Sequence, residues 1–159
     1  MKKIIIPAIV GAGTILFLMK KKIDSPEIQK LIAPIKGTVT SGFGYRIHPI
    51  TKINQFHNGV DIPAPIGTPI VSPADGKIIG IYTNSAGGLQ LLVFHNNGFI
   101  TGYAHLSKVL KLKNTLVKQG ETIALSGNTG NSTGPHLHFT LKKTDNSLLN
   151  PQSYIIFAK

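Results

Sequence analysis

Short runs of β-branched and aromatic residues, cut by turn residues, fill the chain from Pro34 onward and constrain its fold more than any other feature. Triplets such as Asn96-Asn97-Gly98 are typical of turns between extended segments. No helical period of apolar residues is sustained in this region. The sequence therefore predicts an all-β, antiparallel domain, a β-sandwich or partly open barrel with a groove. The predicted strands cover residues 69–73, 76–82, 89–94, 99–103, 122–126 and 137–141.

A chain of 159 residues can bury one core but hardly two. We expect one domain over residues 34–153, preceded by a linker or short helix over residues 23–33 and followed by a tail over residues 154–159. The chain has no cysteine, which excludes disulfides and thiolate metal ligands.

The first 22 residues form a separate segment, in which an apolar run over residues 4–19 lies between two groups of lysines. At about 1.5 Å per residue, a helix over this run falls somewhat short of the roughly 30 Å hydrocarbon core of a bilayer. Lysines that reach toward the headgroups extend such a span, and no small-x-small cleavage site follows Met19. We therefore predict an N-terminal apolar helix in residues 1–22 that is an uncleaved membrane anchor, in preference to a signal segment.

Two histidines, His136 and His138, flank Leu137 in the last predicted strand. Because side chains alternate along a strand, both rings project from one face, while Leu137 and Phe139 point into the core. Two adjacent imidazoles fit a metal site or an acid/base pair. An isolated His-x-His on a solvated face is the commoner interpretation, so the assignment depends on other residues.

A second group places His57 and Asp61 four positions apart, and His105 lies in a further strand-like stretch. Only six acidic residues accompany seventeen basic ones, so a carboxylate here favours a specific partner over a solvating role. A catalytic zinc site needs three ligands from His, Asp and Glu and an open position for water. His57, Asp61 and one of the paired histidines supply that number, and spacing alone leaves open which one.

Four motifs in this order resemble the lysostaphin-type zinc metallopeptidases, the M23 or LytM family. The resemblance runs from about Pro34 to about Pro151 and is carried by Ser41-Gly42-Phe43-Gly44-Tyr45-Arg46, His57-x-x-x-Asp61, Tyr103-Ala104-His105-Leu106 and Gly134-Pro135-His136-Leu137-His138-Phe139. It implies a β-sheet core whose loops wall a substrate cleft, with one Zn²⁺ ion as cofactor.

The resemblance also implies a role for each residue of the predicted site. His57, Asp61 and His138 match the metal ligands. His105 and His136 match the two catalytic histidines that orient the attacking water and stabilise the tetrahedral intermediate.

Candidate substrate-binding residues come from two glycine-containing segments. Gly42 and Gly44 would let an extended peptide approach the metal closely, although a bulge or turn explains them equally well. Asn131 and Thr133 belong to a loop directly above the metal face of the following strand, where polar groups can bind substrate amides. The full set of candidates is Gly42, Gly44, Arg46, Asn131 and Thr133.

Three other positions have no assigned function. Thr140 stands where a Glu is frequent in the family, which changes the surroundings of the site and leaves the metal ligands untouched. His48 is read as an ordinary loop histidine in preference to a residue of the cleft rim. His95 precedes an Asn-Asn-Gly turn, and we expect it to cap a hairpin on the surface.

The formal net charge of +11 comes almost entirely from lysine, since Arg46 is the only arginine. A lysine-rich surface suits loose attraction to anionic polymers such as peptidoglycan, teichoic acids or phospholipid headgroups more than bidentate phosphate recognition. Nucleic acid is not expected as a partner, because the basic residues are scattered and aromatic residues do not interleave with them.

The favoured hypothesis is a zinc-dependent endopeptidase that hydrolyses peptide cross-links of bacterial peptidoglycan, in cell-wall remodelling or in phage lysis or entry. Zinc lowers the pKa of bound water toward about 7, and histidine must handle the protons because no Glu lies beside a ligand. The expected partners are peptidoglycan stem or cross-bridge peptides and, through residues 4–19, a membrane. Such an enzyme faces the periplasm or cell exterior, or is carried in a virion.

Two alternatives belong to other classes of protein. A non-catalytic module of the same fold would bind peptidoglycan or regulate another hydrolase, but such modules usually lack one or more metal histidines. A membrane-associated structural envelope or virion protein would use the anchor and the basic face for assembly. The three lysines after Met19 favour a cytoplasmic domain by the positive-inside tendency, which opposes the outward location that the enzyme needs.

Overall fold

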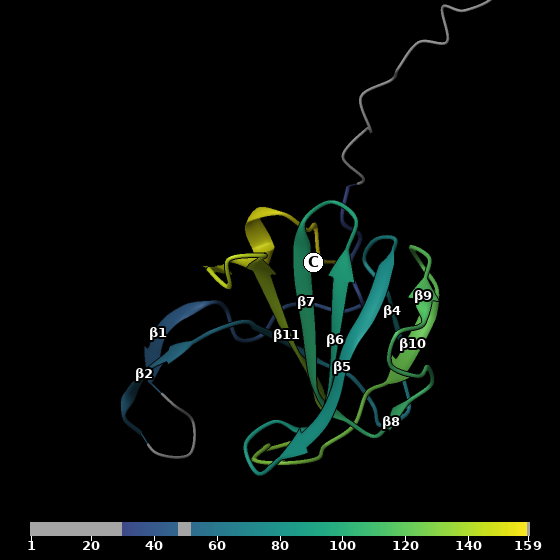
Figure 1. The fold of residues 1–159 in the computed structure, drawn as a ribbon. Coiled ribbons are helices and arrows are strands. Elements are labelled where there is room, and N and C mark those ends of the chain that lie inside the picture. Colours follow the sequence, from purple (N-terminus) through teal and green to yellow (C-terminus); the bar gives the residue numbers. More distant parts are fainter. Residues whose placement is uncertain (1–29, 48–51, 159) are drawn as a thin grey trace, which may run out of the picture.

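Antiparallel strands joined by tight turns make up the regular structure of this computed structural model, which describes residues 30–47 and 52–158 (Figure 1). The strands are β1 (Gly44–Ile47), β2 (Asn54–His57), β3 (Val60–Pro63), β4 (Pro69–Val71), β5 (Gly76–Asn84), β6 (Gly88–His95), β7 (Phe99–Leu106), β8 (Lys108–Val109), β9 (Leu116–Val117), β10 (Thr122–Leu125), β11 (His136–Lys143) and β12 (Leu148–Leu149). Among the described residues the only helical element is the 3₁₀ turn η1 (Pro151–Ser153). The predicted all-β, antiparallel architecture is confirmed.

Three sheets share these strands. The largest has the order β12-β11-β7-β6-β5-β9, with β3 also paired to β11, and a smaller sheet has the order β4-β10-β8. The third is a ribbon of β1 and β2, which projects from one side of the large sheet while β4, β8 and β10 lie on the other side (Figure 1). The large sheet ends in the short strands β12 and β9, so the domain is not a closed barrel.

Strand alternation decides which side chains enter the core. In β11, Leu137, Phe139 and Leu141 are fully buried, whereas His136 and His138 are only partly buried on the opposite face. This is the alternation expected from the sequence. The large and small sheets together bury one continuous cluster, which includes Val60, Ile62, Ile70, Ile78, Leu91, Val93, Ile123, Leu137, Phe139 and Leu141.

All six predicted runs contain strands, but the sequence did not indicate β1, β2, β3 and the two-residue strands β8, β9 and β12. The ribbon strands have the sequences Gly-Tyr-Arg-Ile and Asn-Gln-Phe-His, and most of their residues are at least partly exposed. They therefore lack the apolar run by which a core strand is predicted. The predicted apolar helix, most of the linker and His48 lie outside the described residues. Within residues 30–47 and 52–158 we find no helix of the length and apolarity that crossing a membrane requires.

The expectation for His95 is wrong in one respect. The backbone carbonyl of His95 does accept a hydrogen bond from the Gly98 N–H in the hairpin turn, at 3.0 Å. The side chain, however, is fully buried, with Nδ1 3.2 Å from the Ala74 carbonyl and Nε2 2.7 Å from the Thr101 hydroxyl. The Asn-Asn-Gly motif predicts only where the backbone turns. The direction of the His95 ring is set by the alternation of side chains along β6, which points it into the core.

Candidate metal centre

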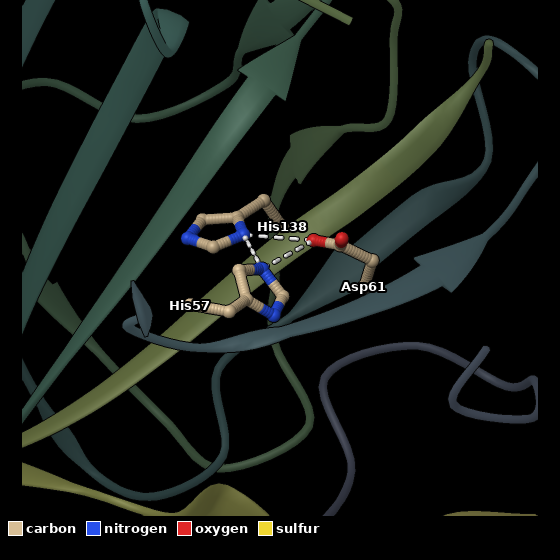
Figure 2. A group of neighbouring side chains, drawn as sticks. All are labelled: His57, Asp61 and His138. Atoms are coloured by element: carbon tan, nitrogen blue, oxygen red, sulfur yellow. Dashed lines mark hydrogen bonds and ion pairs between the residues drawn. The ribbon is translucent and has the colours of Figure 1, made fainter. Parts of the chain in front are cut away.

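Three predicted ligands, His57, Asp61 and His138, converge at one end of the large sheet. His57 ends β2, Asp61 lies in β3 and His138 lies in β11, and their side chains point toward one another (Figure 2). The His138 Nδ1 and His57 Nε2 atoms lie 2.8 Å and 3.2 Å from the Asp61 Oδ1 atom, and 3.1 Å from each other. Three ligand atoms from separate strands therefore surround a single point.

The turn between β2 and β3 sets this geometry. Asp61 and His138 are directly paired across β3 and β11, which places their side chains on the same face. His57 reaches them across a short turn that contains Gly59. A Cβ atom on Gly59 would lie 2.3 Å from the Phe139 carbonyl oxygen, so only glycine lets the turn pack this closely on β11.

Hydrogen bonds on the outer side of each ring determine which nitrogen faces the centre. The His57 Nδ1–H donates to the Gly42 carbonyl at 2.7 Å, which leaves Nε2 as the inward atom. The His138 Nε2–H donates to the Asn58 Oδ1 atom at 3.0 Å, which leaves Nδ1 inward. An outer oxygen partner of this kind is usual for metal-binding histidines, because it fixes both ring orientation and tautomer.

Asp61 is held as an anion. Burial raises its pKa, but hydrogen bonds and positive charge from His138 and His57 lower it by more, so the pKa of this carboxyl lies well below its usual range. The second carboxylate oxygen, Oδ2, accepts a hydrogen bond from Arg46 at 3.4 Å. One oxygen thus remains for the centre while the other is neutralised by the only arginine in the chain.

The donor set fits a zinc ion. Two inward ring nitrogens and a carboxylate oxygen lie 2.8–3.2 Å apart, so either a proton on a ring nitrogen or a bound metal ion must offset the repulsion of their lone pairs. Ligands about 2.0–2.1 Å from a tetrahedral zinc are roughly 3.3 Å apart, close to this spacing. Two neutral imidazoles and one carboxylate are ligands that zinc accepts, with a fourth position left for water or substrate.

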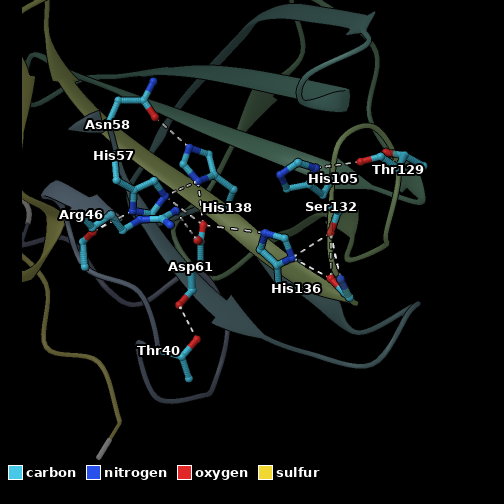
Figure 3. Close-up of polar contacts among 12 residues, drawn as sticks. Thr40, Arg46, His57, Asn58, Asp61, His105, Thr129, Ser132, His136 and His138 are labelled. Carbon is cyan, nitrogen blue, oxygen red and sulfur yellow. Dashed lines mark hydrogen bonds and ion pairs between the residues drawn. The ribbon is translucent and has the colours of Figure 1, made fainter. Parts of the chain in front are cut away.

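His136 joins the centre from the same face of β11 as His138 (Figure 3). Its Nδ1–H donates to the Gly134 carbonyl at 2.7 Å, with the Ser132 hydroxyl 3.2 Å from the same nitrogen. The inward Nε2 atom lies 3.8 Å from the Asp61 Oδ1 atom. His136 therefore stands beside the ligand group with one nitrogen directed at it.

His105 reaches the centre by an irregularity in β7. Tyr103 pairs with Phe139 on the core face, and simple alternation would send His105 to the same face. The register with β6 shifts between Leu89 and Leu91, and His105 has a positive φ of 60°, which is uncommon outside glycine. This bulge turns the His105 ring out of the core, to a centroid distance of 4.6 Å from the His136 ring.

The environment of His105 keeps it neutral. Burial lowers the pKa of this ring, and the positive charge of neighbouring histidines lowers it further. Its Nδ1–H donates to the Thr129 carbonyl at 2.7 Å, so the unprotonated Nε2 atom is the one free for chemistry. A neutral imidazole with a free nitrogen can accept a proton.

An open cleft of about 600 Å³ contains all five side chains. Arg46 lines it from the β1–β2 ribbon, and Asn131 and Thr133 line it from the loop before β11, as does Ser132. Gly42 and Gly44 do not line this cleft; Gly42 supplies the carbonyl that binds His57, and Gly44 pairs with His57 in the ribbon.

Sequence reasoning missed several residues of the site. Asn58 and Thr129 supply oxygens that orient His138 and His105, and Gln90 lines the cleft from β6. For Asn58 a signal existed, because it directly follows a predicted ligand. For Thr129 and Gln90 there was none, since their positions follow from the packing of the 127–135 loop on the β5–β6 hairpin.

Comparisons with known proteins find relatives of this chain by sequence and by fold. Peptidoglycan DD-endopeptidase ShyB of Vibrio cholerae is 48% identical over 102 residues, which cover 64% of this chain and 24% of ShyB. A zinc-containing peptidase from Vibrio cholerae superposes with a TM-score of 0.68 at 42% identity, covering 74% of this chain and 37% of that one. The chain thus spans about a quarter of the length of ShyB.

A further solved structure is matched over nearly its whole length. The catalytic domain of lysostaphin from Staphylococcus simulans superposes with a TM-score of 0.67 at 34% identity, covering 74% of this chain and 91% of that domain. The family model for peptidase family M23 matches residues 55–151, a range that contains all five side chains of the centre. The chain belongs to peptidase family M23.

Proposed function

We propose that this protein is a zinc-dependent endopeptidase that hydrolyses peptide cross-links of bacterial peptidoglycan. The observation that carries the proposal is the convergence of three ligand atoms and two further histidine nitrogens in one open cleft. The name of ShyB, a peptidoglycan DD-endopeptidase, supports this substrate class. The basic composition supports it too, because peptidoglycan carries carboxylates.

The expected zinc cofactor is confirmed by the ligand group formed by His57, Asp61 and His138 and by the zinc-containing relative from Vibrio cholerae. When bound, zinc would acidify a coordinated water and polarise the substrate carbonyl. His57 and His138 supply neutral nitrogens and Asp61 one negative charge, so the site keeps a net positive charge with the ion in place. The Arg46 contact on the outer oxygen of Asp61 holds that carboxylate in orientation.

His105 is the proton acceptor in this proposal. Its Nε2 atom is unprotonated and faces the cleft, because Nδ1–H is committed to the Thr129 carbonyl. Burial lowers the pKa of the ring, so it is neutral at the start of the reaction. It can then take a proton from the attacking water and later return it to the leaving amine.

His136 is the group that stabilises the developing oxyanion. With Nδ1–H bound to the Gly134 carbonyl, a proton on Nε2 would make the ring a cation with a donor directed at the cleft. A preorganised donor of this kind is among the larger contributions to acyl-transfer catalysis.

The alternative of a non-catalytic module is not favoured, because such modules usually lack one or more metal histidines and this chain has both His57 and His138 in the cleft. We retain the membrane attachment through residues 4–19 as part of the proposal. We also propose that the domain lies on the outer side of that membrane, or in a virion, because its polymer substrate is there.

Treatment of purified sacculi with the zinc-loaded full-length protein tests the function. We expect new muropeptides from cleaved cross-links, and no such products from His138→Ala, which also binds less than one zinc per chain. Lys143→Ala, a change at an exposed residue outside the cleft, should retain full activity. Muropeptide profiles identical for the native protein and His138→Ala would remove the enzyme proposal.

A further inference from the structure

A second pocket, of about 100 Å³, opens beside the metal centre on the solvent-facing side of the large sheet. It shares Asn58, Gln90, Ala104 and His138 with the main cleft and extends to Lys142. We propose that this Lys142 pocket binds a free carboxylate of the substrate, on the residue whose amine is released by cleavage. The inference rests on the proposed peptidase function and specifies its substrate.

Strand geometry places the pocket along the direction of β11. His138, Thr140 and Lys142 lie on the same face, because side chains two apart in a strand point the same way. Their Cα atoms span roughly 13 Å at about 3.3 Å per residue, so a substrate residue next to the metal can lie within reach of the lysine. The pocket is thus continuous with the reacting centre.

A glycine keeps the floor of this pocket open. Gly102 pairs with Thr140 across β7 and β11, and a Cβ atom on Gly102 would lie 2.4 Å from the Thr140 hydroxyl oxygen. On the other side, Gly102 pairs with Leu92, whose side chain would lie 3.2 Å from that Cβ. Any larger residue at this position would fill the space between these two side chains.

Several polar groups around the pocket can donate a hydrogen bond. Its lining residues include no carboxylate. The Asn58 Oδ1 atom is occupied by His138, which leaves the Asn58 amide N–H groups to donate. The Thr140 and Tyr82 hydroxyls can donate as well, and neither makes a hydrogen bond to another described residue. The surroundings are therefore complementary to an acceptor.

Lys142 supplies the charge. It is half-buried at the end of the pocket, and no described carboxylate pairs with it. The four acids among the described residues bind elsewhere: Asp61 in the metal centre, Asp75 to Lys118, Glu121 to Lys111 and Asp145 to Ser147. An ammonium group with no carboxylate partner, next to other hydrogen-bond donors, is complementary to an anionic ligand.

Cross-link chemistry identifies which residue carries that anion. The acyl residue of the scissile amide has used its carboxyl group to form the bond. The residue that contributes the amine, a diamino acid in a direct cross-link, can retain a free carboxylate. The Lys142 pocket would therefore distinguish substrates in which this carboxylate is free from those in which it is a carboxamide.

Two synthetic peptides test the inference, each with D-alanine joined to the amine of a diamino acid whose carboxyl group is either free or amidated. We expect the full-length zinc protein to cleave the free form with a kcat/KM about 10- to 100-fold higher. Lys142→Met should abolish this preference mainly by raising KM, and Lys142→Arg should largely restore it. Lys143→Met is the matched control, because Lys143 points to the opposite side of β11 and should leave the preference unchanged.

Binding of the same peptides, followed by NMR with zinc removed so that they stay intact, separates the two proposals. Cleavage of both peptides with no preference, or a preference that survives Lys142→Met, overturns the Lys142 pocket and leaves the peptidase function standing. Lys142-dependent binding of the free carboxylate without any cleavage supports the pocket and removes the peptidase function. Equal binding of both peptides to the native and Lys142→Met proteins also overturns the pocket.

Discussion

Strand β7 contributes residues to two buried polar clusters. The clusters differ in whether the second nitrogen of each histidine ring binds a buried protein group or faces the cleft. In the closed cluster, His95 Nε2 binds the Thr101 hydroxyl at 2.7 Å, and that hydroxyl binds the Tyr103 hydroxyl at 2.8 Å. In the open cluster, formed by His57, Asp61, His105, His136 and His138, each ring binds one outer oxygen and leaves its second nitrogen facing the cleft. Only the open cluster has atoms left for a ligand.

Burial and acidity do not distinguish the two clusters. His95 is fully buried and His105 is 8% exposed, and burial lowers the pKa of both rings. What differs is where the second ring nitrogen points: toward a buried hydroxyl in the closed cluster and toward the cleft in the open one. A buried, perturbed histidine therefore indicates function only when its free nitrogen faces space shared with other ligands or proton donors.

The largest effect should come from His105→Asn in the open cluster. Asparagine tolerates the positive φ at this position better than alanine, so the bulge should remain. Without the proton acceptor we expect kcat to fall by about 10²–10⁴-fold, as is typical for loss of a general base. Zinc content by metal analysis and the melting temperature should be unchanged. A variant that retains near-native kcat would show that His105 belongs with the structural histidines.

An intermediate effect, on stability alone, should come from Thr101→Val in the closed cluster. Valine keeps the shape of threonine but removes the hydroxyl that joins His95 to Tyr103, which leaves two buried polar groups without a partner. We expect the free energy of unfolding in urea to fall by about 1–3 kcal/mol. Peptidase activity per folded molecule should stay native. Loss of activity with unaltered stability would mean that the closed cluster acts on the site.

The smallest effect should be a pH dependence of stability through His95. Its pKa in the folded state lies below the ordinary value of 6.5, so the unfolded chain binds a proton more readily. The stabilisation is fully present above pH 6.5 and is lost as the pH falls toward the folded pKa, with a slope of at most about 1.4 kcal/mol per pH unit. Urea unfolding between about pH 7.5 and 5.5 should show a weaker slope for His95→Gln than for the native protein, both without zinc. Equal slopes would contradict this assignment.

How much of the site is predictable depends on whether the backbone is regular. The orientation of His136 and His138 follows from strand alternation and is correct in the structure. The same rule would have sent His105 into the core, because the bulge and positive φ of β7 have no local sequence signature. Only the family resemblance placed His105 at the centre, and its role there remains a prediction.

Prediction of the strands from the sequence was limited in a similar way, to segments with a regular apolar pattern. Core strands such as β6 and β11 have apolar runs and were predicted, whereas the exposed ribbon of β1 and β2 lacks one and was not. The side chain of His95 was misplaced because an Asn-Asn-Gly turn specifies where the chain reverses and says nothing of which face the preceding residue occupies.

The outer oxygens that hold the site histidines belong to the polypeptide itself: three are backbone carbonyls and one is the amide oxygen of Asn58. The orientation of each ring is therefore specified by the polypeptide and does not depend on the metal ion. An ion that enters the site then finds its ligand atoms already aimed at one point, and little rearrangement of the rings is needed to bind it.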